Sequence, residues 1–366
     1  MTAPAAPVGE VRAAAFEVPT EQPESDGTLE WDSVTVVVAE VDAGGHTGLG
    51  YTYTGAAAAA VISGTLAGAV QGRDAMAING AWWSMVGAIR NLGWPGISAT
   101  AISAVDVALW DLKAKLLDVC VADLLGRAHP AVPVYGSGGL TSYSESQLCE
   151  QLSGWVAQGI PRVKMKVGRQ PGADPARVRA ARQAIGEDAE LFVDANGAYS
   201  RKEALALADT FAREAGVSWL EEPVSSNDLD GLRQIRARAP AGMAVTAGEY
   251  GYHPEYFRRM LDAEAVDVLQ ADVTRACGIT GLQAVGALCA AYEVPFSAHC
   301  APQIHAHAGC AIGALRHCEY FHTHARAEHL LFDGVLDPVD GTLTPDASRP
   351  GLGIELKRSD AERYRV

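Results

Sequence analysis

The chain has 366 residues, of which 48% are hydrophobic and 20% are charged, values that are ordinary for a globular protein. Its 44 Asp and Glu residues outnumber 29 Lys and Arg residues, which gives a formal net charge of −15. This negative excess disfavours nucleic acid and anionic membranes as partners. The length suits one large domain with a smaller domain appended to it.

The sequence predicts neither a membrane span nor an export signal. Ala56–Val70 has no charged residue, but it is too short and too rich in glycine to cross a bilayer. The amino terminus does not show a basic segment followed by a long apolar one. Seven scattered cysteines without a Cys-x-x-Cys pair predict reduced thiols, so we expect a cytoplasmic protein.

Residues 1–126 predict an α+β domain. An arm of about 15 residues leads to the β-branched strand Val34–Asp42, and Gly44-Gly45 then favours a hairpin with Gly48–Tyr53 as the return strand. Between Pro19 and Trp31 we expect a polar loop without regular structure, of a length typical of lids. Two segments have helical periodicity, Ala56–Gly72 and Thr100–Leu125.

After a linker rich in Pro and Gly at 126–133, short apolar runs alternate with helical segments such as Pro175–Ile185 and Arg201–Ala215. Eight apolar runs in a βα series favour a closed parallel barrel, which we place at 127–330. The tail, 331–366, is expected to return to the first domain. The predicted strands are Val132–Ser137, Arg162–Val167, Leu191–Asn196, Trp219–Glu222, Ala244–Gly248, Val266–Gln270, Val294–Ala298 and the segment around Cys318–Phe321.

Chemically distinctive residues recur along these predicted strands. Lys164 and Lys166 are two residues apart in one strand, so their side chains point the same way. Further groups follow at intervals of about 20–28 residues, roughly the length of a strand, a helix and two loops. Their convergence on one barrel mouth would indicate metal-assisted proton transfer. The groups are Asp194, Glu221, Glu249, the pair Asp272 and His299, and Glu319.

Each of these residues has a plainer interpretation. Single acids are mostly surface residues, but three in succession at strand ends suit Mg²⁺ as hard oxygen ligands. Two neighbouring lysines are usually solvated, yet this pair lies in an apolar strand, where one amine would lower the pKa of the other toward that of a base. His299 would be held in one tautomer by Asp272, and Glu319 would donate a hydrogen bond if burial raised its pKa.

Taken together, the motifs resemble the enolase superfamily, in its mandelate racemase/muconate lactonizing enzyme subgroup. Besides the lysine pair, they are Val-Asp-Ala-Asn-Gly, Trp-Leu-Glu-Glu-Pro, Ala-Gly-Glu, Gln-Ala-Asp-Val-Thr-Arg, Ser-Ala-His and His-Cys-Glu-Tyr. Ala108–Lys115 also resembles the helical signature of that family's capping domain. The resemblance covers nearly the whole chain. It implies a (β/α)₇β TIM-like barrel with an N-terminal α+β capping domain that the C-terminal tail completes.

The resemblance also implies a role for each residue. Lys166 would be the base on one face of the substrate, and His299, oriented by Asp272, the acid or base on the other. Lys164 would bind the substrate carboxylate and lower the pKa of Lys166, and Glu319 would hydrogen-bond the enolate oxygen. Asn196 would face the site. The Mg²⁺ ligands would be Asp194, Glu221 and Glu249, with Glu221 preferred over its neighbour Glu222, which would point away.

The expected reaction removes the proton α to a carboxylate, while Mg²⁺ and Glu319 stabilise the enediolate. Dehydration of a sugar acid to a 2-keto-3-deoxy acid is preferred, because most recognised members of the subgroup act on acid sugars. The alternative is a racemase, epimerase or cycloisomerase acting on a hydroxy acid or lactone. A non-catalytic binding protein would have lost a catalytic group, and a dinucleotide-dependent oxidoreductase would need a Gly-x-Gly-x-x-Gly motif after a strand.

The charge of the predicted lid, here taken as residues 17–54, indicates the kind of substrate. Residues 17–54 contain several acids and no Lys or Arg, which disfavours a second carboxylate on the substrate unless Arg169 compensates. Trp31, Tyr51 and Tyr53 are expected to contact a polyol chain. We therefore expect a small-molecule carboxylate as partner, and a homo-oligomer. The pairs His305/His307 and His322/His324 are interpreted as helix or loop histidines without metal.

Overall fold

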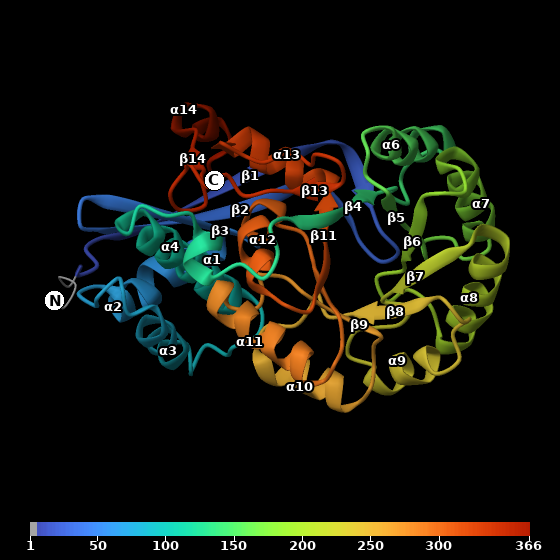
Figure 1. Ribbon diagram of the computed structural model, residues 1–366, viewed down its shortest axis with the longest axis horizontal. Helices are drawn as coiled ribbons and strands as arrows, with labels where there is room; N and C mark the ends of the chain where they lie inside the picture. Colours follow the sequence, from blue (N-terminus) through green and yellow to red (C-terminus); the bar gives the residue numbers. More distant parts are fainter. Residues whose placement is uncertain (1–5) are drawn as a thin grey trace.

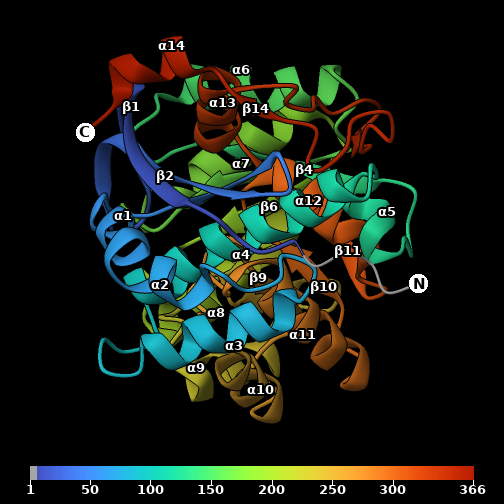
Figure 2. The ribbon, with the colours of Figure 1, turned by 90° about the vertical axis from the view of Figure 1, so that its left-hand side faces the viewer.

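The computed structural model describes residues 6–366, which form a capping domain beside a closed barrel (Figure 1). The start of the expected amino-terminal arm, 1–5, lies outside the described residues. The cap contains an antiparallel sheet in the order β1-β2-β3, and Figure 2 shows its helices beside that sheet. The strands are β1 (Val11–Ser25), β2 (Glu30–Ala43) and β3 (His46–Tyr53).

The long helix α4 (Ile97–Leu116) lies directly on β3. A Cβ atom added at Gly50 would lie 2.1 Å from the carbonyl oxygen of Ala104, so this close approach needs glycine. The remaining helices of the cap are α1 (Ala57–Val61), a π-helical turn (Ile62–Leu66), α2 (Ala67–Val70), α3 (Ile78–Ala88) and α5 (Val121–Leu125).

Two expectations for the cap were wrong. The segment from Pro19 to Trp31 is not an irregular loop, because β1 continues to Ser25 and pairs with β2 after an irregularity between Pro19 and Glu24. Its turn is closed by Asp26, whose carboxylate accepts the backbone N–H groups of Thr28 and Leu29. The helix expected at 100–125 is interrupted after Leu116, where Asp118 takes the left-handed conformation. The sequence interpretation also omitted α3.

All eight predicted barrel strands are present, with end points shifted by a few residues. They are parallel in sequence order, and the pairing of β11 with β4 closes the barrel. A parallel barrel places the carboxyl ends of all strands at one mouth. The strands are β4 (Val132–Gly138), β5 (Arg162–Lys166), β6 (Glu190–Asp194), β7 (Val217–Glu221), β8 (Ala244–Ala247), β9 (Val268–Ala271), β10 (Phe296–Ala298) and β11 (Leu315–Phe321).

Seven helices connect these strands, and α13 (His322–Leu331) follows the last one. Local sequence explains several ends: Ser144 and Ser200 form capping boxes at the starts of α6 and α8, and Gly216 ends α8 in the left-handed conformation. The connecting helices are α6 (Glu145–Ala157), α7 (Asp174–Ile185), α8 (Arg201–Ala215), α9 (Leu229–Arg236), α10 (Pro254–Asp262), α11 (Gly278–Ala291) and α12 (Pro302–Ala308).

The C-terminal segment returns to the cap, as predicted. Strand β13 (Thr342–Leu343) pairs with β4, and β12 (Phe332–Asp333) pairs with β14 (Glu355–Leu356). After α14 (Arg358–Ala361) and a 3₁₀ turn (Glu362–Tyr364), Arg365 forms a β-bridge with Phe16 of β1. The exact domain boundaries at 126/127 and 330/331 stay a prediction.

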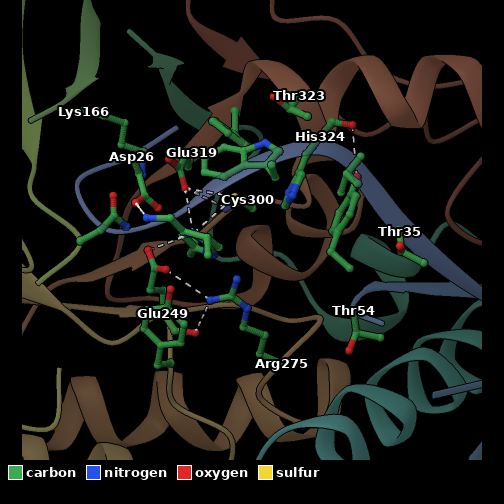
Figure 3. Close-up of a pocket in the computed structure, with 18 of the residues that line it drawn as sticks. Asp26, Thr35, Thr54, Lys166, Glu249, Arg275, Cys300, Glu319, Thr323 and His324 are labelled. Carbon is green, nitrogen blue, oxygen red and sulfur yellow. Dashed lines mark hydrogen bonds and ion pairs between the residues drawn. The ribbon is translucent and has the colours of Figure 1, made fainter. Parts of the chain in front are cut away.

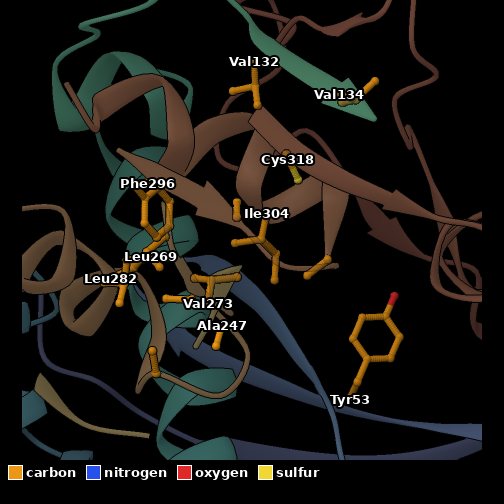
Figure 4. Close-up of a cluster of buried hydrophobic side chains, with 14 of the residues drawn as sticks. Tyr53, Val132, Val134, Ala247, Leu269, Val273, Leu282, Phe296, Ile304 and Cys318 are labelled. Atoms are coloured by element: carbon orange, nitrogen blue, oxygen red, sulfur yellow. The ribbon is translucent and has the colours of Figure 1, made fainter. Parts of the chain in front are cut away.

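The apolar core continues from the cap into the barrel, and Figure 4 shows part of it, with Tyr53 of β3 near the edge of the cluster. A second cluster fills the barrel interior, where the rings of Phe192 and Trp219 stack with centroids 5.0 Å apart. The barrel is therefore packed rather than hollow, which leaves its mouth for function. Within 6–366, no helix is long and apolar enough to cross a membrane.

Candidate active site

The predicted site residues meet at the carboxyl ends of the barrel strands. Lys164 and Lys166 lie on β5, Glu319 lies on β11, and all three are buried. Five more lie at or within two residues of successive strand ends, from β6 to β10, and are buried as well. They are Asp194, Glu221, Glu249, Asp272 and His299.

Three carboxylates form a candidate metal centre. Oxygens of Asp194, Glu221 and Glu249 all lie within 4.8 Å of one another. Glu221 accepts a hydrogen bond of 2.9 Å from Trp219 Nε1, while Oε2 of Glu249 is buried without a hydrogen-bond partner. A buried carboxylate oxygen without a hydrogen-bond partner is available as a metal ligand. The three-carboxylate donor set therefore fits Mg²⁺.

Both lysines are bound to these acids. Nζ of Lys166 lies 2.5 Å from Asp194, and Nζ of Lys164 lies 2.5 Å from Glu221 and 2.8 Å from Glu319. Burial lowers the pKa of Lys166 and so does Lys164, as expected, but Asp194, Glu319 and Glu249 together outweigh them and raise that pKa. Lys164 is fully buried and ion-paired behind the cavity, so the structure does not support its predicted contact with the substrate carboxylate.

His299 is oriented by Asp272, as predicted. Its Nδ1 lies 2.9 Å from Oδ2 of Asp272, and its Nε2 lies 3.1 Å from Oε2 of Glu249 without hydrogen-bond geometry. Burial alone would lower the pKa of His299, but the surrounding acidic groups, Cys300 and Glu249 foremost, raise it. Burial would raise the pKa of Asp272, yet the hydrogen bond from His299 lowers it to about 2. The pair thus holds a proton on the imidazole.

The expectation for Glu319 was wrong in this structure. Burial does raise its pKa, but Lys164 and His299 outweigh burial and lower it, so Glu319 is an ionised acceptor rather than a hydrogen-bond donor. Its carboxylate accepts from Ser137 Oγ at 2.6 Å and from the backbone N–H of Cys300 at 3.2 Å. The error arose because the cations come from two other strand ends, whose joint effect no single motif reveals.

A cavity of about 310 Å³ opens beside these groups, lined by the barrel mouth, by the cap and by the start of α13 (Figure 3). Seven predicted residues line it: Lys166, His299, Glu249, Glu319, Asn196, Trp31 and Tyr53. Five others lie behind its wall: Lys164, Asp194, Glu221, Asp272 and Tyr51. The cavity therefore presents the two acid–base candidates and Glu249 to a ligand, while Asp194 and Glu221 of the candidate metal centre lie behind its wall.

The lid residues were only partly predicted. Tyr51 is fully buried and donates a hydrogen bond of 2.5 Å to Glu328 of α13, so it is a structural residue and the predicted contact with substrate was wrong. The Tyr53 ring lines the cavity and stacks on His324 with centroids 3.6 Å apart. Trp31 lines the cavity too, and its Nε1 donates to Glu24.

Sequence reasoning missed several residues of the site. Arg275 lines the cavity and donates to Glu249, and its place in the quoted Gln-Ala-Asp-Val-Thr-Arg motif was a usable signal. Cys300 also lines the cavity, directly after His299. Glu222 does not line the cavity, but it is buried, and burial together with Glu249 raises its pKa. No local pattern identifies Ser137.

The paired histidines lie in helices, as interpreted. His305 and His307 are buried in α12, where His305 Nε2 accepts from the backbone N–H of Val273 and Nδ1 donates to the carbonyl of Cys300. His322 and His324 begin α13. Burial lowers the pKa of His324 to about 3, so this residue is neutral beside the cavity.

Comparisons with known proteins identify the family of both domains. Residues 147–361 match the enolase C-terminal domain-like family model, and 11–126 match the mandelate racemase/muconate lactonizing enzyme N-terminal domain. A mandelate racemase/muconate lactonizing enzyme-like protein from Rubrobacter xylanophilus is 57% identical, with a TM-score of 0.97 over 98% of this chain and 100% of that one. A magnesium-bound racemase from Streptomyces coelicolor A3(2) is 30% identical, with a TM-score of 0.92 over 98% and 100%.

Among curated relatives, 3,6-anhydro-alpha-L-galactonate cycloisomerase of Streptomyces coelicolor is 32% identical over 94% of this chain and 96% of its own length. L-talarate/galactarate dehydratase of Salmonella typhimurium is 29% identical over 88% and 81%. The relatives are thus sugar acid dehydratases and cycloisomerases. With both domains matched and the site residues in place, this chain belongs to the mandelate racemase/muconate lactonizing enzyme family of the enolase superfamily.

Proposed function

We propose that this protein is an Mg²⁺-dependent lyase that removes the proton α to the carboxylate of a sugar acid and expels the β-hydroxyl as water. The observation that carries the proposal is one cavity lined by Lys166, by His299 and by Glu249 of the candidate metal centre. On the closed barrel their strands, β5 and β10, are separated by β4 and β11, so the two side chains approach the cavity from different sides. The dehydratases among the relatives support this reaction.

The chain's own residues supply the proton transfers. Lys166 takes the proton from the α-carbon on one side of the substrate. His299, held by Asp272, protonates the departing β-hydroxyl, and the resulting enol tautomerises to a 2-keto-3-deoxy acid. When bound by Asp194, Glu221 and Glu249, Mg²⁺ supplies positive charge that stabilises the negative charge on the substrate carboxylate and offsets the acids that raise the pKa of Lys166. Arg275 holds Glu249 in place.

A second candidate function is cycloisomerisation of a sugar lactone or anhydro acid. It begins with the same α-proton abstraction, but the β-leaving group is the ring oxygen, so no water is lost. The relatives that cover most of this chain favour it: the Streptomyces enzyme and D-galactarolactone cycloisomerase of Agrobacterium fabrum, which is 29% identical over 97% of this chain and 98% of its own length.

One experiment separates the two reactions. Purified protein with Mg²⁺ is incubated with a panel of aldonates, aldarates and their lactones. Products are detected as α-keto acids, and their masses are measured by mass spectrometry. Dehydration predicts an α-keto product lighter than its substrate by one water, whereas cycloisomerisation predicts a product of unchanged mass. If the protein turns over none of these sugar acids or lactones in the presence of Mg²⁺, both proposed reactions are contradicted.

We further infer that the preferred sugar acids carry a single carboxylate. Among described residues lining the cavity, Lys166, His299 and Arg275 are the cationic ones, and Arg275 already binds Glu249. Arg169, the cation named above as able to compensate for the acids of the lid, pairs with Glu30 at 2.5 Å. The remaining wall offers neutral groups, including Thr35 and Thr54. A higher kcat/KM for aldarates than for matched aldonates would contradict this inference.

Two broader expectations are also part of the proposal. A cytoplasmic location is supported by seven cysteines that are all free thiols. A homo-oligomer is supported by exposed apolar side chains on the cap, Trp83 of α3 and Leu92 after it, which are 65% and 58% exposed. Sedimentation velocity of the purified protein gives the oligomeric state, and a monomer at micromolar concentration would contradict the expectation.

A further inference from the structure

We propose that His299, Cys300 and Glu319 form a second, inhibitory metal site that takes a thiophilic cation of the Zn²⁺ type. These residues are buried and line the cavity: His299 and Cys300 directly follow β10, and Glu319 lies in β11. Figure 3 shows Cys300 and Glu319 side by side, joined by a drawn contact. One nitrogen, one sulfur and one oxygen are the donors that zinc accepts in proteins, whereas Mg²⁺ prefers oxygen alone.

The spacing of the donor atoms matches a tetrahedral site. Cys300 Sγ lies 3.4 Å from His299 Nε2 and 3.3 Å from Glu319 Oε2, and Nε2 lies 3.4 Å from that same oxygen. Bonds of about 2.3 Å to sulfur and about 2.0–2.2 Å to nitrogen and oxygen, at tetrahedral angles, place such donors roughly 3.4–3.6 Å apart. A cation therefore fits with side-chain adjustments of a few tenths of an ångström.

Neighbouring groups already orient the three donor residues by hydrogen bonds. Asp272 accepts from Nδ1 of His299 and so leaves Nε2 for the cavity, the arrangement in which a carboxylate orients a metal-binding histidine. Ser137 binds Glu319, and His305 holds the carbonyl of Cys300.

Binding would displace protons and remove a catalytic candidate. Burial and Glu319 raise the pKa of the Cys300 thiol, so the thiol is protonated until the cation replaces its proton. The imidazole likewise loses its Nε2 proton, and both protons pass to solvent. His299 can then no longer exchange a proton with a substrate. Metal binding is independent of the function proposed above, whereas the inhibition rests on it.

Cobalt spectroscopy tests the binding without any substrate. Co²⁺ is titrated into protein saturated with Mg²⁺, and the sulfur-to-cobalt charge-transfer band in the near ultraviolet is followed. We expect one Co²⁺ per chain, a band that Zn²⁺ abolishes by displacement, and loss of that band in Cys300→Ser. The matched control is Cys149→Ser, a half-buried thiol on α6 whose Sγ contacts the carbonyl of Ala180, and it should keep the band.

Two further variants keep the test decisive. His299→Asn retains the sulfur but removes the imidazole, and should weaken Co²⁺ binding by at least about tenfold; Asp272→Asn, which removes only the orienting carboxylate, should weaken it by about 10–100-fold. Absence of the band in the unmodified protein, or its survival in folded Cys300→Ser, overturns the site. If the same concentration of Zn²⁺ inhibits Cys300→Ser and the unmodified protein, the inhibition does not come from this site. That result would leave the proposed function unaffected.

Discussion

At the scale of single residues, the candidate site balances charge within a nearly dry space. Lys164 and Lys166 neutralise Asp194 and Glu221, while Glu249 has one oxygen that nothing in the described structure hydrogen-bonds. Burial raises the pKa of Glu249, but His299, Arg275 and Lys166 lower it well below its usual range, so the carboxylate is ionised, as a metal ligand must be. Glu249 is therefore the residue whose charge should matter most to metal affinity.

Glu249→Gln is expected to abolish turnover and to weaken Mg²⁺ binding by at least about tenfold, because it removes one of three anionic ligands. The fold should be retained, since the amide has nearly the shape of the carboxylate. Calorimetric Mg²⁺ titration and circular dichroism measure the two effects. Glu255→Gln, an exposed acid on the nearby α10, is the control and should change neither. Unaltered Mg²⁺ affinity in Glu249→Gln would remove this residue from the metal centre.

At the scale of elements, the contact between β3 and α13 fastens the cap to the barrel. Tyr51 and Tyr53 of β3 both donate to Glu328 of α13, and Glu328 also accepts from the backbone of Gln303. Burial raises the pKa of Glu328 from 4.5 to about 8, so the folded protein favours its neutral form. The carboxyl group thus links the stability of the cap–barrel contact to pH.

Because its folded pKa is the higher one, Glu328 contributes stability that is complete below about pH 4.5 and is lost as pH rises to about 8. Glu328→Gln cannot ionise and escapes this loss. Between pH 5 and 8 we expect the variant to gain on the unmodified protein by up to about 1.4 kcal/mol per pH unit. Chemical denaturation of both proteins at several pH values measures the difference, and a difference that stays constant or falls with pH would contradict the assignment.

The packing of α4 on β3 allows a second test at this scale. At Gly50 an added methyl group would meet backbone atoms of Ala104 and Ala108, which cannot move without shifting the helix. Gly50→Ala should therefore lower the free energy of unfolding by about 1–3 kcal/mol. At Gly55 an added Cβ meets nothing within 4 Å, so Gly55→Ala is the control. Equal stability of the two variants in urea would show that the contact is looser than described.

At the scale of the whole molecule, the barrel could be predicted because its signals repeat locally. Each apolar run of strand length is followed by a polar or charged residue at its end, so Asp194, Glu221 and Glu249 were placed correctly without any long-range information. The side chain of Tyr51 could not be placed, because its partner Glu328 lies 277 residues later in the chain. The charge state of Glu319 depends in the same way on cations from other strand ends.

We expect Lys166 and His299 to address opposite faces of a substrate α-carbon. This arrangement is measured by exchange of the α-proton in D₂O, followed by NMR on a pair of C2-epimeric aldonates with Mg²⁺ present. Lys166→Ala should lose exchange of one epimer by at least about 100-fold more than the other, and His299→Asn should show the reverse preference. Lys202→Ala, an exposed lysine on α8, is the control and should leave both exchange rates unchanged. If both variants lose exchange of the same epimer and keep that of the other, the two-face arrangement is wrong.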